Sequence, residues 1–345
     1  MPPLSYRPPS WIKQFVLRHK RNAPCWIVDL IDILPRLPNG YVPRYPFASP
    51  LSDYSPFFII GSGRSGNTLL RKLLMENSRV VIPPEIPGLG STIRKFTQVA
   101  ARPWQEAMNV TVDYFRQLAD IDVQTTATDG APYCYNLKEE LNIDFDQIKS
   151  RLMDLPMPER SLAAIITEIY QAFSQRAVGD FLPWGDKTPW NVFHFDRLRK
   201  VYPQARYIHM LRDGRDCVVS YVDSLGALMN LDYEEAAYRW RDSIRQADRI
   251  QRTVPGNFLE IRYEEMTSFP EATVQRVLDF LNLEPCKNKL ISPEDLGDAK
   301  SIHHKHLGDR ISTVSVGRWK RSLPQNEINT ILKIIGKDLM KKGYL

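Results

Sequence analysis

The pattern of apolar and polar positions along the chain predicts short buried strands that alternate with helices. Apolar runs typical of strands occur within Phe57–Ile60, Arg79–Gly88, Ala205–Leu211 and Asn257–Met266. Apolar residues at helical spacing predict helices over Trp104–Leu118, Leu162–Phe173, Tyr233–Arg252 and Gln325–Lys342, and another begins near Phe269. Strands that lead through polar turns into helices are typical of the α/β class, so we predict one central parallel sheet flanked by helices.

We divide the chain into an N-terminal extension, residues 1–54, and one α/β domain, residues 55–345. The extension is rich in proline and arginine, and its one apolar stretch, Trp26–Leu34, could form a helix. Its basic residues could make a peripheral contact with a membrane surface or bind an acidic partner, although a solvated helix face explains them more simply.

Composition narrows the class of protein. The chain is 43% hydrophobic, which is enough for a sizeable core. Its formal net charge of +6 suits anionic ligands, but the 46 Lys and Arg residues are dispersed among 40 Asp and Glu residues, so we expect no nucleic-acid partner. The sequence has no apolar run near the roughly 20 residues of a membrane span and begins without the apolar core of a signal peptide. The four cysteines are widely spaced, so we expect a cytoplasmic enzyme with reduced, structural cysteines.

The first strand runs into a glycine-rich loop that predicts phosphate binding. The segment Gly61–Thr68 reads Gly-Ser-Gly-Arg-Ser-Gly-Asn-Thr and leads directly into a helix. Glycines let the backbone curl with its N–H groups inward, the helix start adds unpaired donors, and Arg64 and Thr68 add side-chain donors. The spacing is similar to that of the nucleoside-triphosphate P-loop, but Asn67 stands where that loop has its lysine. Taken alone, the loop fits a structural turn or a generic nucleotide site equally well.

A second strand-turn-helix unit carries a candidate anion clamp. Within Ala205–Tyr221, Arg212 stands at the strand end and Ser220 lies eight residues further on, in the predicted helix. The guanidinium group offers a bidentate charged donor, and the serine adds a hydroxyl donor. In isolation, this segment could be a turn held by an Arg-Asp salt bridge. Paired with the glycine-rich loop, in this order along the chain, it favours a functional site.

The segment Arg64-Ser65-Gly66-Asn67-Thr68 closely resembles the 5′-phosphosulfate loop of sulfotransferases that use 3′-phosphoadenosine 5′-phosphosulfate (PAPS). Those enzymes hold the 3′-phosphate with an arginine at a strand end and a serine eight residues on, as Arg212 and Ser220 stand here. Over roughly Ser55–Leu323 the chain resembles the PAPS-dependent sulfotransferase family of the bacterial type, with similarity to protein-tyrosine sulfotransferases in its motifs. The resemblance implies a P-loop-like sulfotransferase fold and transfer of a sulfuryl group from PAPS to a hydroxyl or amine, releasing adenosine 3′,5′-bisphosphate without a metal.

The resemblance also implies a set of nucleotide-binding residues. Tyr263, in a Tyr-Glu-Glu segment, would lie near the adenine, although it could equally be a core residue. Gly317-Arg318-Trp319-Lys320 resembles the C-terminal segment of bacterial sulfotransferases in which a basic loop closes over the nucleotide, so Ser301, Arg310 and Arg318 are loop candidates. The full predicted set is Gly63, Arg64, Ser65, Gly66, Asn67, Thr68, Arg212, Ser220, Tyr263 and Arg318.

Three residues are candidates for catalysis by the same resemblance. Glu85 stands at the distance from Arg64 that separates the catalytic glutamate of protein-tyrosine sulfotransferases from their loop arginine, so it is the candidate base. Asp186-Lys187-Thr188-Pro189 resembles the segment that presents a catalytic lysine, although it could also simply start a helix. Arg64, Lys187 and the loop amides would stabilise the negative charge of the transition state. The chain departs from the family at Asn67, where relatives often carry Thr, and at Pro87, where protein-tyrosine sulfotransferases carry Arg, so their peptide acceptor is not carried over.

The sequence leaves the acceptor unnamed. Residues from about 92 to 180 form a mostly helical insertion, joined by a polar segment around Asp122–Tyr135, that would line the acceptor pocket. A small-molecule, lipid or carbohydrate acceptor would fit. Two other functions stay as alternatives: a P-loop kinase, which would need a lysine after Gly66, and a noncatalytic nucleic-acid-binding protein, which would need a concentrated basic face. The neighbouring histidines of His303–His306 predict no metal site, because adjacent residues cannot all face one ion.

Overall fold

The structure is a computed structural model that describes residues 42–50, 55–85, 88–119, 122–126, 132–136, 143–178, 182–229, 232–286 and 311–345. Several sequence predictions lie outside these residues. They are the Trp26–Leu34 helix and most of the N-terminal extension, the loop candidates Ser301 and Arg310, and the histidines of His303–His306. The division into an extension and one domain therefore stays a prediction.

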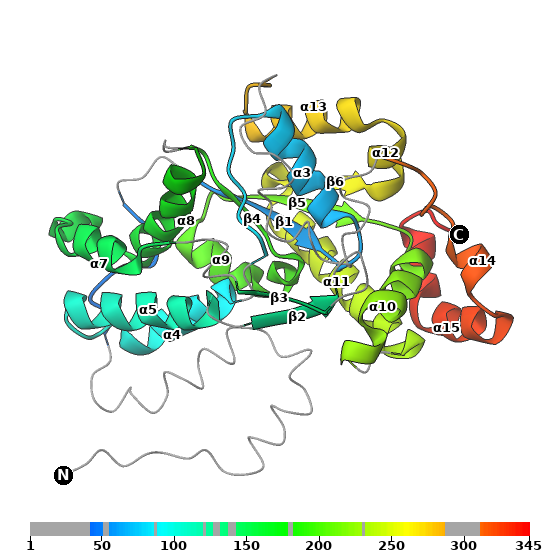
Figure 1. The fold of residues 1–345 in the computed structure, drawn as a ribbon, viewed down its shortest axis with the longest axis horizontal. Coiled ribbons are helices and arrows are strands. Elements are labelled where there is room, and N and C mark those ends of the chain that lie inside the picture. Colours follow the sequence, from blue (N-terminus) through cyan, green and yellow to red (C-terminus); the bar gives the residue numbers. More distant parts are fainter. Residues whose placement is uncertain are drawn as a thin grey trace, which may run out of the picture.

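Within the described residues, a parallel sheet of four strands in the order β4-β1-β5-β6 forms the centre of the molecule (Figure 1). The strands are β1 (Phe57–Gly61), β4 (Gly185–Lys187), β5 (Arg206–Leu211) and β6 (Phe258–Arg262), and each neighbouring pair is parallel. Every residue of β1 is buried, because both faces of the sheet are covered. The predicted α/β class with a central parallel sheet is confirmed.

Helices flank this sheet. Figure 1 shows α4, α5, α7 and α8 to the left of the sheet and α10, α14 and α15 to the right, with α3 and α13 above it. The helices are α3 (Asn67–Asn77), α4 (Leu89–Val99), α5 (Trp104–Ala119), α7 (Phe145–Met153), α8 (Leu162–Val178), α9 (Phe195–Val201), α10 (Gly214–Met229), α11 (Tyr233–Thr253), α12 (Tyr263–Ser268), α13 (Pro270–Leu281), α14 (Trp319–Ser322) and α15 (Gln325–Lys341). Short 3₁₀ helices cover Met157–Glu159, Pro189–His194 and Pro255–Asn257. Among the described residues, none of these helices has both the length and the apolar character needed to cross a membrane.

Two sequence predictions need correction. The predicted strand within Arg79–Gly88 is wrong: Val81 makes only an isolated bridge to Trp184, because Pro83 and Pro84 lack the N–H groups that would extend a ladder. The segment Asp122–Tyr135 was expected to be a polar connection between helices. Instead it contains an antiparallel hairpin of β2 (Asp122–Thr126) and β3 (Pro132–Asn136). The threonine, valine and tyrosine residues of these strands favour an extended backbone, although the strands show no regular alternation of apolar and polar residues.

Two hydrophobic cores hold the sheet between its helices. The larger one joins β1 and β5 to the helices α3, α4, α5 and α8. The smaller one joins α10, α11 and α15 around the buried Trp240. Because the strands are parallel, their carboxyl ends share one edge of the sheet. The glycine-rich loop follows β1 at this edge, and Lys187 is the last residue of β4. Arg212 comes directly after β5, and Tyr263 comes directly after β6.

Candidate active site

The glycine-rich loop after β1 is closely packed and depends on glycine at two positions. Gly61 has a φ of 150°, and a Cβ there would lie 2.7 Å from the carbonyl oxygen of Met210. Gly66 has a φ of 92°, and a Cβ there would lie 2.5 Å from a ring carbon of Tyr263. Arg64 adopts a positive φ of 66° between them. The loop thus curls into a conformation that side chains rarely tolerate, as in loops that bring backbone N–H groups close to phosphates.

The start of α3 has no side-chain cap. Gly66, as the N-cap, has no side chain to accept from the first N–H groups, and the first turn of α3 has no acidic residue. Asn67, in the position of the P-loop lysine, donates from Nδ2 to the carbonyl oxygen of Ser62 at 2.9 Å and so closes the loop on itself. Ser65 is buried with its Oγ 3.6 Å from Cys217 Sγ, and Thr68 is buried as well.

Arg64 and Arg212 connect this loop to the second predicted anion clamp. Arg64 Nε donates to Ser220 Oγ at 3.0 Å, and Arg212 Nη1 donates to the Arg64 carbonyl oxygen at 3.0 Å. The second terminal nitrogen of Arg212 donates to the carbonyl oxygen of Ser315 at 2.7 Å. Burial lowers the pKa of Arg64, and the positive charge of Arg212 acts in the same direction. Two guanidinium groups are therefore brought together at the carboxyl edge of the sheet.

The ring of Tyr263 packs against the guanidinium group of Arg212. The Arg212 guanidinium carbon is 4.2 Å from the centroid of the Tyr263 ring, a cation–π distance. The same ring covers Gly66. Tyr263 therefore packs between the glycine-rich loop and the turn that carries Arg212, and its predicted contact with adenine stays a prediction.

Lys187 and Glu85 form an ion pair beside the loop. Lys187 Nζ lies 3.3 Å from Glu85 Oε2; the lysine side chain is 1% exposed and the glutamate side chain 35% exposed. Lys187 is fixed because its strand pairs with β1, with Lys187 opposite Ile59. The Glu85 carboxylate contributes to the electrostatic field at Arg64. The structure thus brings two of the three predicted catalytic side chains together, with Lys187 buried and Glu85 partly exposed.

Asp186, the neighbour of Lys187, anchors this strand end and was not singled out from the sequence. The Tyr170 hydroxyl donates to Asp186 at 2.5 Å, and Asn191 Nδ2 donates at 2.6 Å. Burial raises the pKa of Asp186 to about 6, against the opposing effect of hydrogen bonds from Tyr170 and Thr188. The sequence signal that could have identified Asp186 is a carboxylate within a short buried strand, because a buried carboxylate needs several hydrogen-bond donors.

The predicted loop residue Arg318 lies against helix α10. Its guanidinium group pairs with Asp223, and the Asp216 carboxylate accepts from the backbone N–H groups of Gly317 (2.8 Å) and Trp319 (2.9 Å). The segment thus reaches the site through Ser315 and Arg212, while the Arg318 side chain contacts the helix. Its role toward a nucleotide stays a prediction.

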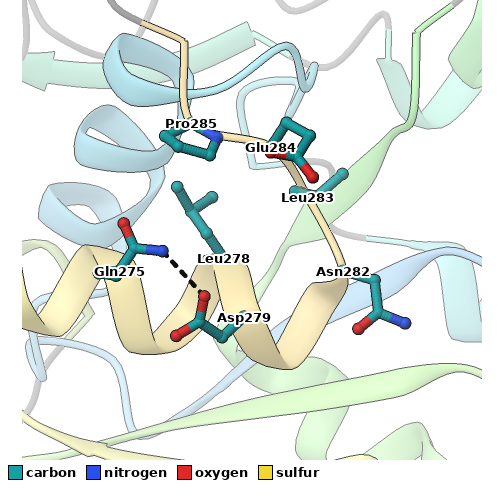
Figure 2. A pocket seen from close by; sticks show the side chains of 7 residues that line it. All are labelled: Gln275, Leu278, Asp279, Asn282, Leu283, Glu284 and Pro285. Atoms are coloured by element: carbon teal, nitrogen blue, oxygen red, sulfur yellow. Dashed lines mark hydrogen bonds between the residues drawn. The ribbon is translucent and has the colours of Figure 1, made fainter.

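A surface hollow lies away from this site. It has a volume of about 370 Å³ and is lined by residues of α13 and the segment after it, namely Gln275, Leu278, Asp279, Asn282, Leu283, Glu284 and Pro285 (Figure 2). Leu281, at the end of α13, accepts a hydrogen bond from Arg206, which begins β5. The hollow is therefore near the amino end of the sheet, opposite the edge that carries Arg212. The described residues also hold no cluster of three His, Cys, Asp or Glu side chains that could bind a metal.

Comparisons with known proteins agree with this arrangement. The model of the sulfotransferase family matches residues 56–287, so the chain belongs to the sulfotransferase family. Protein-tyrosine sulfotransferase A of Caenorhabditis elegans is 27% identical over 44% of this chain and 38% of its own. Omega-hydroxy-beta-dihydromenaquinone-9 sulfotransferase Stf3 of Mycobacterium bovis is 25% identical over 66% of this chain and 63% of its own. The matches thus span less than two thirds of these relatives.

The solved structures agree on the fold. The sulfotransferase domain from the curacin biosynthetic pathway superposes with a TM-score of 0.54 at 20% identity, covering 83% of this chain and 98% of that domain. The resemblance to sulfotransferases seen in the sequence motifs is therefore confirmed for the family and for the fold.

Proposed function

We propose that this protein transfers a sulfuryl group from PAPS to a hydroxyl group and releases adenosine 3′,5′-bisphosphate. The observation that carries the proposal is the pairing of Arg64 with Ser220 and of Arg212 with the Arg64 carbonyl, which joins the two phosphate-binding motifs into one site. A ligand with phosphate groups at both its 3′ and 5′ ends matches two separate anion-binding units.

The residues present fit such a nucleotide. Arg212 is only 6% exposed, and within the described residues its Nε has no hydrogen-bond partner. A buried, charged donor of this kind favours an anionic ligand. The uncapped start of α3 offers further N–H donors to the 5′ end. We assign Arg212 and Ser220 to the 3′-phosphate and residues 63–68 to the 5′-phosphosulfate.

The remaining residues have distinct chemical roles in this proposal. As the new bond forms between sulfur and the acceptor oxygen, the bond between sulfur and the phosphate oxygen breaks, and the acceptor proton must leave. Glu85 takes that proton. Lys187 and Arg64 stabilise the charge on the leaving phosphate oxygen. The 3.3 Å contact between Lys187 and Glu85 supports these paired roles, because it would hold the base beside the cation.

The activities of the relatives favour a hydroxyl acceptor over an amine. One group acts on protein tyrosine and another on a hydroxylated menaquinone derivative, and both of these acceptors present a hydroxyl. A panel of a tyrosine peptide, a hydroxylated isoprenoid quinone and a monosaccharide, each incubated with PAPS and analysed by mass spectrometry for sulfuryl addition, would identify the class.

Isothermal titration with adenosine 3′,5′-bisphosphate, ADP and ATP tests the donor assignment. We expect the bisphosphate to bind most tightly to the wild type and to lose at least about tenfold in affinity in Arg212→Ala, because a charged hydrogen bond is lost. Arg252→Ala, on an exposed position of α11, removes the same charge elsewhere and should bind like the wild type. Equal or tighter binding of ATP by the wild type would instead support a P-loop kinase.

A further inference from the structure

The turn that carries Arg212 is held in place by contacts from three other elements. Trp240 Nε1, on α11, donates to the Arg212 carbonyl oxygen at 3.1 Å. The Asp213 N–H donates to Glu264 Oε1, on α12, at 3.0 Å. Arg215 forms two hydrogen bonds with the Asp213 carboxylate, at 3.0 and 2.7 Å. The position of the Arg212 side chain therefore depends on groups outside its own strand.

Tyr344, after α15, contacts two of the groups that hold this turn, Glu264 and Arg215. After α15, Gly343 takes a φ of 73° and the Tyr344 N–H donates to the Leu339 carbonyl oxygen at 2.9 Å, so the backbone folds back. The Tyr344 hydroxyl then donates to Glu264 Oε2 at 2.9 Å. The Tyr344 carbonyl oxygen accepts from Arg215 Nη2, also at 2.9 Å.

The side chain of Tyr344 is itself well fixed. The Arg262 guanidinium carbon lies 5.0 Å from the centroid of its ring, and the same arginine donates to the Lys342 carbonyl oxygen at 2.6 Å. Burial, followed by the negative charge of Glu264, raises the pKa of Tyr344, so the hydroxyl stays a neutral donor at working pH. One carboxylate, Glu264, thus receives the tyrosine hydroxyl on one oxygen and the Asp213 amide on the other.

We infer that Tyr344 is a positioning residue for the 3′-phosphate clamp: through Glu264 and Arg215 it fixes the turn that aims Arg212. The inference rests on the proposed function, because it assigns the turn to the recognition of a 3′-phosphate. Tyr344 contacts no reacting atom in this scheme. Without its hydroxyl, Glu264 loses the donor that orients its second oxygen, and the Asp213 amide loses a fixed acceptor.

Loss of the Tyr344 hydroxyl should weaken recognition of the 3′-phosphate and leave recognition of the 5′-phosphate unchanged. Adenosine 3′,5′-bisphosphate and adenosine 5′-monophosphate differ only in the 3′-phosphate, so the ratio of their affinities reports on the groups assigned to that phosphate, Arg212 and Ser220. A looser turn lowers the affinity for the bisphosphate and leaves that for the monophosphate nearly unchanged. A general loss of structure would lower both affinities together.

The test compares Tyr344→Phe with the wild type by isothermal titration of both nucleotides. We expect the preference for the bisphosphate to fall about tenfold, with the affinity for the monophosphate within about twofold of the wild type. Tyr114→Phe, on α5, makes the same chemical change far along the chain and should keep the full preference. Glu264→Gln, which keeps the tyrosine but replaces its acceptor, should show the same selective loss.

The outcomes separate the two proposals. A wild type with no preference for the bisphosphate overturns the proposed function and this inference with it. A wild-type preference that persists in Tyr344→Phe or in Glu264→Gln overturns the inference alone. A parallel fall in the affinities for both nucleotides also overturns it, because Tyr344 would then serve only to hold the fold.

Discussion

Gly66 shows how the loop depends on a single residue type. Its φ of 92° lies in the left-handed region, and a Cβ would lie 2.5 Å from the Tyr263 ring and 3.2 Å from the Met266 methyl carbon. The loop conformation and the placement of Tyr263 are therefore coupled at this position.

We expect Gly66→Ala to lower the free energy of unfolding by at least about 1–2 kcal/mol, because the left-handed backbone is costly for alanine and the added methyl meets a ring. The variant should also lose binding of adenosine 3′,5′-bisphosphate. Urea unfolding and isothermal titration measure the two effects. Gly336→Ala, in the interior of α15, is the matched control. A Cβ added at Gly336 would have no atom within 4 Å, so this variant should stabilise the protein by up to about 1 kcal/mol. Wild-type stability and binding in Gly66→Ala would show that the loop relaxes freely.

A change at Glu85 should distinguish the binding of the nucleotide from the chemical step. Glu85 makes its ion pair with Lys187 and lies outside the hydrogen bonds that join Arg64 to Ser220 and Arg212, so we expect a change at Glu85 to spare the nucleotide. We expect Glu85→Gln to lower kcat by roughly 10²–10⁴-fold, the usual contribution of a general base, with the affinity for the bisphosphate within about twofold.

The check for Glu85→Gln is single-turnover transfer to whichever acceptor the panel identifies. Glu106→Gln, which neutralises a half-exposed glutamate paired with Arg102, should behave like the wild type. An unchanged kcat in Glu85→Gln would leave this residue as an ion-pair partner of Lys187 only.

At this scale, local motifs could be predicted and distant partners could not. Arg64, Arg212 and Ser220 stand in short segments with their own chemical signature, and the structure brings them into contact. Ser315 contacts Arg212 through its backbone carbonyl oxygen. Tyr344 contacts Arg215 through its backbone carbonyl oxygen and Glu264 through its hydroxyl. Such contacts depend on tertiary packing and leave no local pattern.

At the scale of elements, a buried ionic cluster fastens α15 to the sheet. His209 Nδ1, on β5, lies 3.0 Å from Glu260 Oε2, on β6, and Lys342 Nζ lies 2.6 Å from the same oxygen. Lys342 also lies 3.0 Å from Asp248 of α11. Burial alone would raise the pKa of Glu260, but the hydrogen bond and charge of His209, with Lys342, lower it to about 2 from an ordinary 4.5.

This shift predicts a loss of stability in acid. Because the pKa of Glu260 is depressed in the folded state, its contribution is complete above pH 4.5 and disappears as the pH falls toward 2. The shift corresponds to about 3 kcal/mol. We expect Glu260→Gln to be less stable at neutral pH and to lose less stability between pH 4.5 and pH 2, measured by urea unfolding. Glu271→Gln, on the exposed start of α13, should keep the wild-type profile; an identical profile for Glu260→Gln would contradict the assignment.

The elements themselves were predictable where burial produces a simple pattern. Strand β1 is buried along its whole length and forms a continuous apolar run. Strands β5 and β6 keep mostly apolar residues, although His209 and Glu260 interrupt them. The hairpin of β2 and β3 mixes polar and β-branched residues and gives no such run. The false strand at Arg79–Gly88 has the right apolar residues, and only the effect of Pro83 and Pro84 on its hydrogen bonding excludes it.

At the scale of the whole molecule, the site joins parts of the chain that are far apart in sequence. The loop after β1, the turn after β5, helix α10 and the segment that carries Ser315 meet through hydrogen bonds of Arg64 and Arg212. The order of these motifs along the chain indicated the family. The meeting of the C-terminal segment with the Arg212 turn depends on how α15 packs on α10 and α11, which periodicity does not encode.

A ligand held by so many separate elements should stabilise the whole protein against global unfolding and not only its own loop. At a hundredfold excess over its Kd, adenosine 3′,5′-bisphosphate should add about 2.7 kcal/mol to the free energy of unfolding. The slowest-exchanging amides, expected in β1 and β5, report global unfolding and should exchange about a hundredfold more slowly with ligand. Hydrogen exchange followed by mass spectrometry measures this. Arg212→Ala at the same nucleotide concentration is the control: with its affinity lowered by at least about tenfold, the gain should fall to about 1.4 kcal/mol or less and the slowing to about tenfold or less. Slowing confined to Gly61–Thr68 would contradict the prediction, because it would mean that the nucleotide binds to the loop without engaging the Arg212 turn.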